Sequence, residues 1–174
     1  MSADPNCGVA HGAAEDAPVA DRLLVAVFAS PVSAFLLRYG ADLGFRTVLV
    51  EPDAARVPDG QPAVGSFADL DAELAGGSAD VVVTDHHREE LGEQLRDALA
   101  RPARWVGVMG NPRHEGPHVA ALTALGVPPE EIARVHRPIG LDIGSRAPAE
   151  IAVSTLAGLL ADRNGRSGGF AHAR

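Results

Sequence analysis

The sequence predicts an α/β fold of the Rossmann-like kind, with three α/β/α layers around a mostly parallel sheet. Short apolar runs have the length and composition of strands that are buried on both faces, at residues 22–28, 80–84 and 105–109. Segments with helical spacing of apolar residues separate these runs, so strands and helices alternate along the chain. Such alternation favours a parallel sheet with right-handed crossovers, for which we expect the strand order 3-2-1-4-5.

The opening βαβ unit consists of a strand, a helix and a second strand, at residues 22–28, 32–43 and 46–50. Gly44 is placed to end the helix. A dinucleotide-binding turn needs Gly-x-Gly-x-x-Gly, whereas this chain has Ala29, Pro31 and Ala34 in those places. Ser30 and Pro31 suit the N-cap and the first helical position, so we expect this helix end to cap itself.

The altered turn argues against standard binding of NAD(P) or FAD, because Pro31 brings a ring and lacks an N–H group. Glu51 and Asp53 follow the second strand, where an acid would otherwise hold a ribose hydroxyl group. We therefore expect Glu51 and Asp53 to be solvated loop acids.

The next elements are predicted from apolar spacing and from the glycines and prolines between them. They are short or medium strands and helices at residues 63–64, 67–75, 80–84, 89–100, 105–109, 117–125 and 130–135. We expect 138–144 to be a loop-strand. A closing helix reaches Arg163, with Pro148 in its first turn and Glu150 near the positive end of its dipole. Its buried face is formed by Ala152, Thr155, Leu156, Leu159 and Leu160.

Candidate ligand-binding residues follow the central strands, because open α/β sheets bind ligands beyond the carboxyl ends of their strands. Asp85, His86 and His87 follow the strand at 80–84. In one interpretation a histidine binds a metal or acts as an acid or base. In the other, Asp85 caps a helix, and the two imidazoles are partly exposed and point in different directions. His86 and His87 are therefore weak metal candidates.

The next loop along the same rim contains Gly110, Asn111 and Arg113. Arg113 would either clamp a phosphate or carboxylate through two hydrogen bonds or remain solvated. Together with Ser30, which opens the first helix, these residues are candidate cofactor-binding residues.

Asp142 is the leading candidate for a functional acid. It lies between two apolar residues in a segment bracketed by Gly140 and Gly144, so packing of this segment would partly desolvate its carboxylate. Asp142 is either a ligand-binding acid or a structural residue that hydrogen-bonds backbone N–H groups, and the two roles are compatible. Gly144 is included in the candidate site, and His136 is expected to be structural.

Composition limits the classes of partner and compartment. The chain has 174 residues, a net charge of −8 and a pI of about 5.3, which argues against nucleic acid as the main partner. The one cysteine, Cys7, excludes an internal disulfide and fits a reducing, cytoplasmic location, and no apolar run is long enough to span a membrane. We expect flexible tails at 1–20 and 165–174 around one domain at 21–164. Cys7 and His11 in the first tail are an incidental pair rather than a metal site.

Several of these segments resemble the C-terminal Rossmann domain of the XdhC/CoxI accessory proteins. The resemblance covers about residues 22–163 and is carried by residues 105–110, 128–132, 136, 138–144 and 150–154. It implies a role in maturation of molybdenum hydroxylases of the xanthine dehydrogenase or CO dehydrogenase type. The implied cofactor is the molybdenum cofactor, or molybdopterin, and the implied partner is the client enzyme.

Three functional classes remain open: this non-catalytic accessory or chaperone role, an NAD(P)-binding oxidoreductase, and a degenerate Rossmann module that only binds a protein partner. Longer members of the family carry an additional N-terminal domain. We therefore expect cofactor handling to need residues from such a domain or from a partner chain that supplies it. A homodimer is also open.

Overall fold

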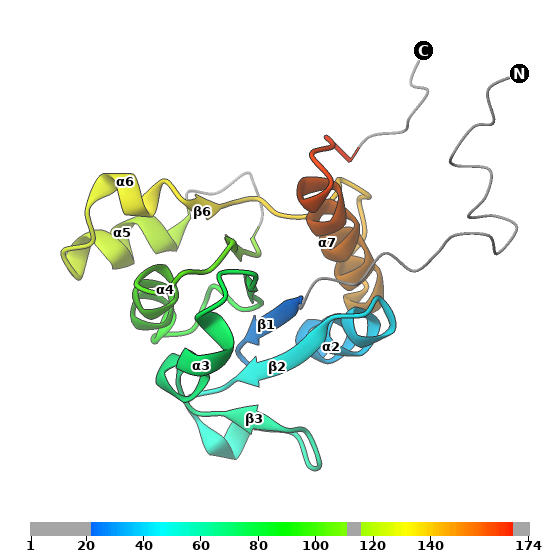
Figure 1. The fold of residues 1–174 in the computed structure, drawn as a ribbon, viewed down its shortest axis with the longest axis horizontal. Helices are drawn as coiled ribbons and strands as arrows, with labels where there is room; N and C mark the ends of the chain where they lie inside the picture. The colour runs from blue at the N-terminus through cyan, green and yellow to red at the C-terminus, as the bar shows by residue number, and fades with distance from the viewer. Residues whose placement is uncertain (1–21, 111–115, 169–174) are drawn as a thin grey trace, which may run out of the picture.

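A six-stranded sheet, parallel at every pairing, forms the centre of the computed structural model, which describes residues 22–110 and 116–168. The strand order is β3-β2-β1-β4-β5-β6, which confirms the expected order and adds a sixth strand at one edge (Figure 1). The strands are β1 (Leu23–Val27), β2 (Arg46–Val50), β3 (Ala63–Val64), β4 (Asp80–Val83), β5 (Trp105–Val108) and β6 (Val135–His136).

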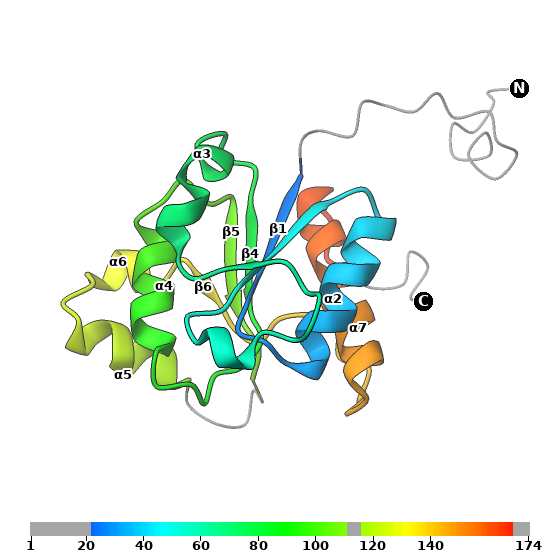
Figure 2. The ribbon, with the colours of Figure 1, turned by 90° about the horizontal axis from the view of Figure 1, so that it is seen from below.

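Helices cover both faces of this sheet, which confirms the Rossmann-like α/β prediction. Figure 2 shows α2 (Pro31–Asp42) and α7 (Pro148–Arg163) packed side by side on one face. The opposite face carries α3 (Asp71–Leu74), α4 (Leu91–Leu99), α5 (Pro117–Ala124) and α6 (Pro129–Ile132). Two 3₁₀ helices, η1 (Ala54–Arg56) and η2 (Phe67–Leu70), complete the assigned elements of the described residues.

Alternating strand residues build a separate core on each face of the sheet, because successive side chains of a strand point to opposite sides. Val25 of β1 packs with Leu95 of α4 in the first core. Leu24 of β1 packs with Leu36 of α2 and Leu156 of α7 in the second. Strands buried on both faces read as continuous apolar runs, which is why the composition of β1 and β4 predicted their position.

The amino ends of the central strands are joined to the end of α7 by charged side chains. The buried Asp80 carboxylate accepts hydrogen bonds from the guanidinium groups of Arg104 and Arg163, each at 2.6 Å. Arg163 also donates to the carbonyl of Ser78 at 2.6 Å. These contacts fix the carboxyl end of α7 at the edge of the sheet opposite to the ends of the strands where ligands bind in open α/β folds.

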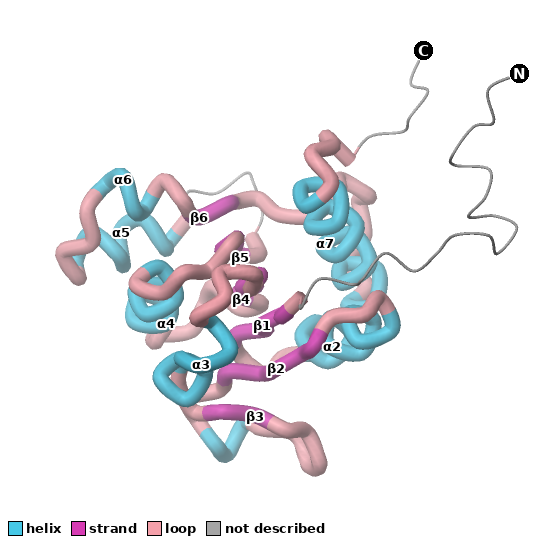
Figure 3. Tube along the Cα trace, viewed as in Figure 1, coloured by secondary structure: helices cyan, strands magenta, loops and turns pink. Residues whose placement is uncertain are grey.

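Two element predictions near β6 are wrong. The helix expected at 130–135 is α6, which ends at Ile132, and Val135 belongs to β6. The loop-strand expected at 138–144 contains no strand; Figure 3 shows a loop that leads from β6 to α7. The strand stops at His136 because Arg137 is followed by Pro138, whose missing N–H group cannot extend a sheet. No helix in 22–110 or 116–168 combines the length and apolar character needed to cross a membrane.

Candidate functional site

The turn after β1 caps its own helix, as the sequence predicted. Ser30 accepts the N–H of Ser33 at 3.0 Å, and Ser33 accepts the N–H of Ser30 at 2.8 Å, which forms a capping box. The hydroxyl of Ser30 also donates to Thr84 at the end of β4, at 3.0 Å. Ser30, predicted as a cofactor-binding residue, therefore already has partners on two elements.

The expectation that Glu51 is a solvated loop acid is wrong. Glu51 is 2% exposed, and its carboxylate accepts the N–H groups of Ala29 at 2.7 Å and Asp53 at 3.0 Å. Arg88, which follows β4, donates to both carboxylate oxygens at 2.9 and 3.1 Å. Glu51 thus binds the N–H of the first βα turn, a group that faces the phosphates in nucleotide-binding members of this fold class. Asp53, by contrast, has a partly exposed side chain that pairs with Arg56, as expected for a loop acid.

Hydrogen bonding holds Glu51 in its charged form. Burial by itself would raise the pKa of Glu51, but hydrogen bonds from Arg88 and from the N–H groups of Ala29 and Asp53 outweigh it and lower the pKa. Arg88 also pairs with Glu90 at 2.9 Å, so its guanidinium lies between two carboxylates. Its pKa is raised by these hydrogen bonds.

Phe28 completes this closed arrangement beneath the first turn. It is fully buried and has a φ of 73°, a left-handed conformation that a bulky residue rarely adopts. Its N–H donates to Val50 at 2.9 Å, and Arg88 lies over its ring at 4.5 Å from the centroid. A glycine at this position would leave the backbone accessible to a ligand. This chain instead has the aromatic ring of Phe28, which is covered by the Arg88–Glu51 ion pair.

The residues after β4 lie at the rim as predicted, and both imidazoles are at least partly exposed, but two details of the structural interpretation differ. Asp85 accepts the N–H of His87 at 2.9 Å, which caps a turn; helix α4 begins only at Leu91. The rings of His86 and His87 lie 4.0 Å apart, so the expectation that they diverge is wrong. Burial lowers the pKa of His86, and His87 and Arg137 add to this, whereas Asp85 and a hydrogen bond with the Met109 backbone oppose it.

Arg137 is a rim residue that the sequence interpretation missed. A Cβ atom placed on Gly110 would lie 2.7 Å from two nitrogen atoms of its guanidinium. One placed on Gly116 would lie 3.0 Å from a third. The guanidinium therefore lies between the end of β5 and the start of α5, and its charge acts on both His86 and His118. The sequence feature that could have indicated this role is the position of Arg137, directly after the last strand and just before the 138–144 segment.

The predicted site is thus only partly brought together. His86, Gly110 and Arg137 meet at the ends of β4, β5 and β6. The candidates Asn111 and Arg113 lie outside the described residues, as do Cys7 and His11. Among the described residues, no group of three His, Cys, Asp or Glu side chains is arranged to hold a metal ion.

Asp142 lies in the loop between β6 and α7, beyond Arg137. The expectation that packing would desolvate its carboxylate is wrong. The side chain is exposed, on the stretch that runs along α7. That stretch is fixed through Leu141, whose N–H donates to Ser154 at 3.2 Å and whose carbonyl accepts the Ser154 hydroxyl at 2.6 Å. Gly140 and Gly144 both have positive φ, at 85° and 67°, a conformation that favours glycine at the two positions that bracket Asp142.

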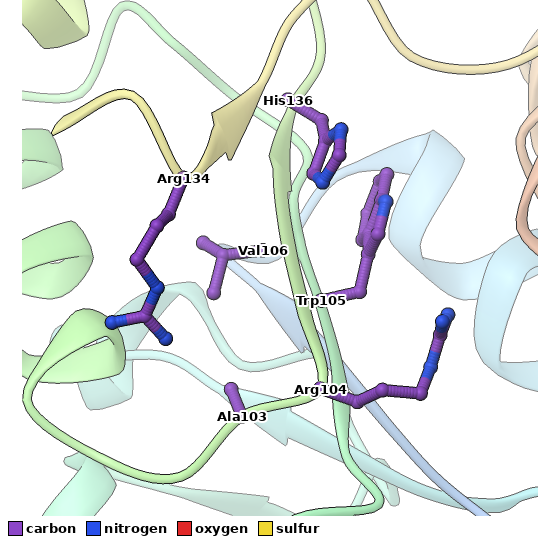
Figure 4. Close-up of a pocket in the computed structure, with 6 residues that line it drawn as sticks. All are labelled: Ala103, Arg104, Trp105, Val106, Arg134 and His136. Carbon is purple, nitrogen blue, oxygen red and sulfur yellow. The ribbon is translucent and has the colours of Figure 1, made fainter. Parts of the chain in front are cut away.

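A small hollow of about 160 Å³ lies at the opposite end of β5 from Gly110. Figure 4 shows Trp105 and His136 stacked beside it, with ring centroids 5.0 Å apart. The stack supports the structural role expected for His136. Arg104, which also lines the hollow, is engaged with Asp80 and Asp162. The hollow is therefore part of the architecture that holds α7, and the candidate site remains at the carboxyl ends of the strands.

Comparison with known proteins agrees with this architecture. A family model described as the XdhC Rossmann domain matches residues 24–159. A solved structure described as a xanthine dehydrogenase from Bacillus halodurans is 25% identical, with a TM-score of 0.61 over 84% of this chain and 44% of that one. YqeB of Escherichia coli K12, described as uncharacterized, is 38% identical over 78 residues, which cover 45% of this chain and 14% of YqeB. The chain thus spans less than half the length of either relative, and it belongs to the XdhC Rossmann-domain family.

Proposed function

We propose that this chain serves as an accessory protein to enzymes of the xanthine dehydrogenase type and uses the rim at the ends of β4, β5 and β6 as its working surface. The family match and the Bacillus halodurans relative support the accessory role. The observation that carries the choice of surface is the buried Glu51 carboxylate on the N–H of Ala29. It occupies the first turn, so the remaining ligand-facing edge is the one that contains His86, Gly110 and Arg137.

The same observation argues against an NAD(P)-dependent oxidoreductase. A dinucleotide would need the N–H groups of the first turn for its pyrophosphate and a free acid after β2 for its ribose. Here the N–H of Ala29 donates to the carboxylate of Glu51, and Arg88 donates to both oxygens of the same carboxylate. The residues present therefore do not fit a dinucleotide held in the standard way.

A molybdenum cofactor fits the other edge better. The cofactor is anionic, and the ends of β5 and β6 offer two glycines, a guanidinium group and two imidazoles rather than a cluster of carboxylates. When bound, the cofactor would supply the redox centre destined for the client enzyme. This chain would hold it through Arg137, His86 and the backbone of Gly110, with Asp142 as an exposed acid on the neighbouring segment.

The test is a pull-down from cells that express a molybdenum hydroxylase, analysed for protein partners and for bound pterin by its fluorescence after oxidation. We expect recovery of the hydroxylase with pterin, and a several-fold lower pterin yield with Asp142→Ala. Asp59→Ala, an exposed acid in a loop between β2 and β3, is the matched control and should leave the yield unchanged. An equal pterin yield from Asp142→Ala and Asp59→Ala would remove Asp142 from the site.

A protein-docking module is the second candidate, and one observation favours it. Val153 and Ile143 are 55% and 50% exposed, on α7 and on the segment that runs along it. Exposed apolar side chains of this size on adjoining segments are a common feature of protein interfaces. This function predicts recovery of a client enzyme without pterin in the same pull-down. It also predicts that Val153→Asp lowers the recovery of the enzyme, while Asp142→Ala has no effect.

A further inference from the structure

We propose that the outer face of helices α2 and α7 is a dimerisation surface, where a second copy of this chain binds through the same two helices about a two-fold axis. The two helices lie side by side in one layer, so their outer sides form a continuous face (Figure 2). The central contact is a pair of salt bridges between Arg38 of each copy and Asp42 of the other. This inference goes beyond the proposed function, because it does not depend on the strand-end rim or on any cofactor.

Helix α2 carries two charged residues, Arg38 and Asp42, which are exposed and lie one turn apart. Residues at this spacing on a helix often pair with each other. Here the guanidinium of Arg38 instead lies over the rings of Phe35 and Tyr39, at 4.9 and 5.0 Å from their centroids. Within the described residues, neither Arg38 nor Asp42 forms a salt bridge. The outer side of α2 thus presents one unmatched positive charge and one unmatched negative charge.

Opposite charges one turn apart are self-complementary when two copies of a helix meet antiparallel. A two-fold axis at the level of Gly40, midway between Arg38 and Asp42, brings each charge opposite its counterpart in the second copy. Such a contact repeats every interaction, so the one pattern on α2 yields two salt bridges. The chain has a net charge of −8, so a second copy is favoured on a face where acidic side chains are matched by basic ones.

Helix α7 contributes an uncharged surface beside these charges. Residues 151–161 contain no charged side chain over three turns, although α7 packs against the sheet on one side only. Val153 is 55% exposed on the outer side of α7, and Leu43, which follows α2, is 42% exposed. A surface helix ordinarily carries polar side chains on the side away from the core. The apolar outer side of α7 therefore indicates a face that another surface covers.

The cluster of Arg38, Phe35 and Tyr39 is preorganised for this contact. The two rings lie 5.7 Å apart, and Arg38 donates to the hydroxyl of Tyr39 at 3.4 Å. Tyrosine and arginine are enriched among the residues that contribute most of the binding energy of interfaces. Because stacking already restricts the side chain of Arg38, its salt bridge to the second copy costs less conformational entropy than one from a mobile arginine.

The size of the face determines the expected strength of the dimer. Helices of 12 and 16 residues are about 18 and 24 Å long and pack about 10 Å apart, so the face is near the lower end of the range for specific interfaces. We therefore expect a reversible dimer with a Kd on the order of 10 µM.

The test is sedimentation velocity of the full chain at constant ionic strength, over concentrations from about tenfold below to about tenfold above this Kd. Arg38→Asp and Asp42→Arg each place like charges opposite each other twice, so each should raise the Kd by about tenfold or more. The two substitutions change the net charge in opposite directions, so a general effect of net charge does not explain a loss in both. The double variant Arg38→Asp with Asp42→Arg exchanges the pairs and should return the Kd to within about threefold of the wild-type value.

Arg96→Asp is the matched control, because Arg96 is an exposed arginine on α4, on the opposite face of the sheet, and undergoes the same change of charge. It should leave the Kd within about twofold. Asp42→Arg serves alone if loss of the Arg38 stacking impairs folding.

A chain that stays monomeric over the whole range would overturn the dimer, as would a Kd that neither single variant raises or that the double variant does not recover. A chain that is monomeric alone, but whose Arg38→Asp variant no longer recovers a client enzyme in the pull-down, would assign this face to the client and also overturn the dimer.

Discussion

Replacing Glu51 by glutamine is expected to lower the free energy of unfolding by about 3 kcal/mol, because it leaves the guanidinium of Arg88 buried beside a neutral partner. Arg88 and Glu51 have side chains that are 6% and 0% exposed, so water cannot replace the lost carboxylate. Glu90 retains part of the pairing from a more exposed position. Urea unfolding followed by circular dichroism measures the change.

The matched control is Asp53→Asn, two residues further along the chain. Asp53 pairs with Arg56, but both side chains are about half exposed, so we expect a loss of no more than about 0.5 kcal/mol. The double variant Glu51→Gln with Arg88→Met should recover most of the lost stability, because it removes the uncompensated charge and keeps an acceptor for the Ala29 N–H. Equal losses in Glu51→Gln and Asp53→Asn would mean that the buried pair contributes no more than a surface one.

The Glu51 pair also predicts how stability depends on pH. The folded-state pKa of Glu51 is lowered from its ordinary value of 4.5, so its contribution is complete above that value and is lost as the pH falls through the folded pKa. The wild-type free energy of unfolding should therefore fall more steeply below about pH 4.5 than that of Glu51→Gln. Urea midpoints measured at several acidic pH values would show this as two curves that approach each other toward low pH.

The sequence could predict those features that local patterns determine. Residues 46–50 and 63–64 form strands at the predicted bounds, because apolar, β-branched runs between turn residues specify strands locally. Helix α7 begins at Pro148 and ends at Arg163 as predicted, since proline, an early acid and a spaced apolar face all indicate the same element. The N-cap at Ser30 was likewise predicted from Ser30 and Pro31 alone, whereas the reciprocal bond from Ser33 that completes the capping box was not.

Partnerships between distant residues could not be predicted in this way. Glu51 and Arg88 are 37 residues apart and meet only because β2 and β4 flank β1 in the sheet. An acid directly after a strand is expected to be a solvated loop residue when no partner is evident in the nearby sequence. The burial of Glu51 was missed because its partner, Arg88, is distant in the chain. Arg137 and His118 were missed for the same reason, because Gly110 and Gly116 bring them together only in the folded chain.

For Asp142 the opposite error occurred, because the sequence predicted burial for a residue that is exposed. Its apolar neighbours suggested burial, yet in the fold it is Gly140 that packs against α7. A residue's neighbours in sequence determine its environment only where regular structure fixes the direction of the side chain, and 138–144 forms neither helix nor strand.

Gly140→Ala is expected to lower the free energy of unfolding by about 3 kcal/mol, an effect similar in size to that of Glu51→Gln. Its φ of 85° is unfavourable for alanine by about 1–2 kcal/mol. The added Cβ would lie 2.7 Å from the Ser154 hydroxyl and 3.1 Å from the Thr155 nitrogen, which overpacks the contact with α7 at a further cost of about 1–3 kcal/mol. A Cβ atom placed on Gly158, one turn further along α7, would lie 3.1 Å from the Cα of Gly140, so the loop lies close against the backbone of the helix at this point.

Gly144→Ala separates the two causes. Gly144 also has a positive φ, of 67°, but no atom lies within 4 Å of its Cβ position, so only the conformational cost of about 1 kcal/mol should remain. Urea unfolding of both variants gives the difference that belongs to packing against α7. If the two variants lose the same stability, the loop is not held by its contact with α7, and the placement of Asp142 beside that helix would have to come from the Leu141 hydrogen bonds alone.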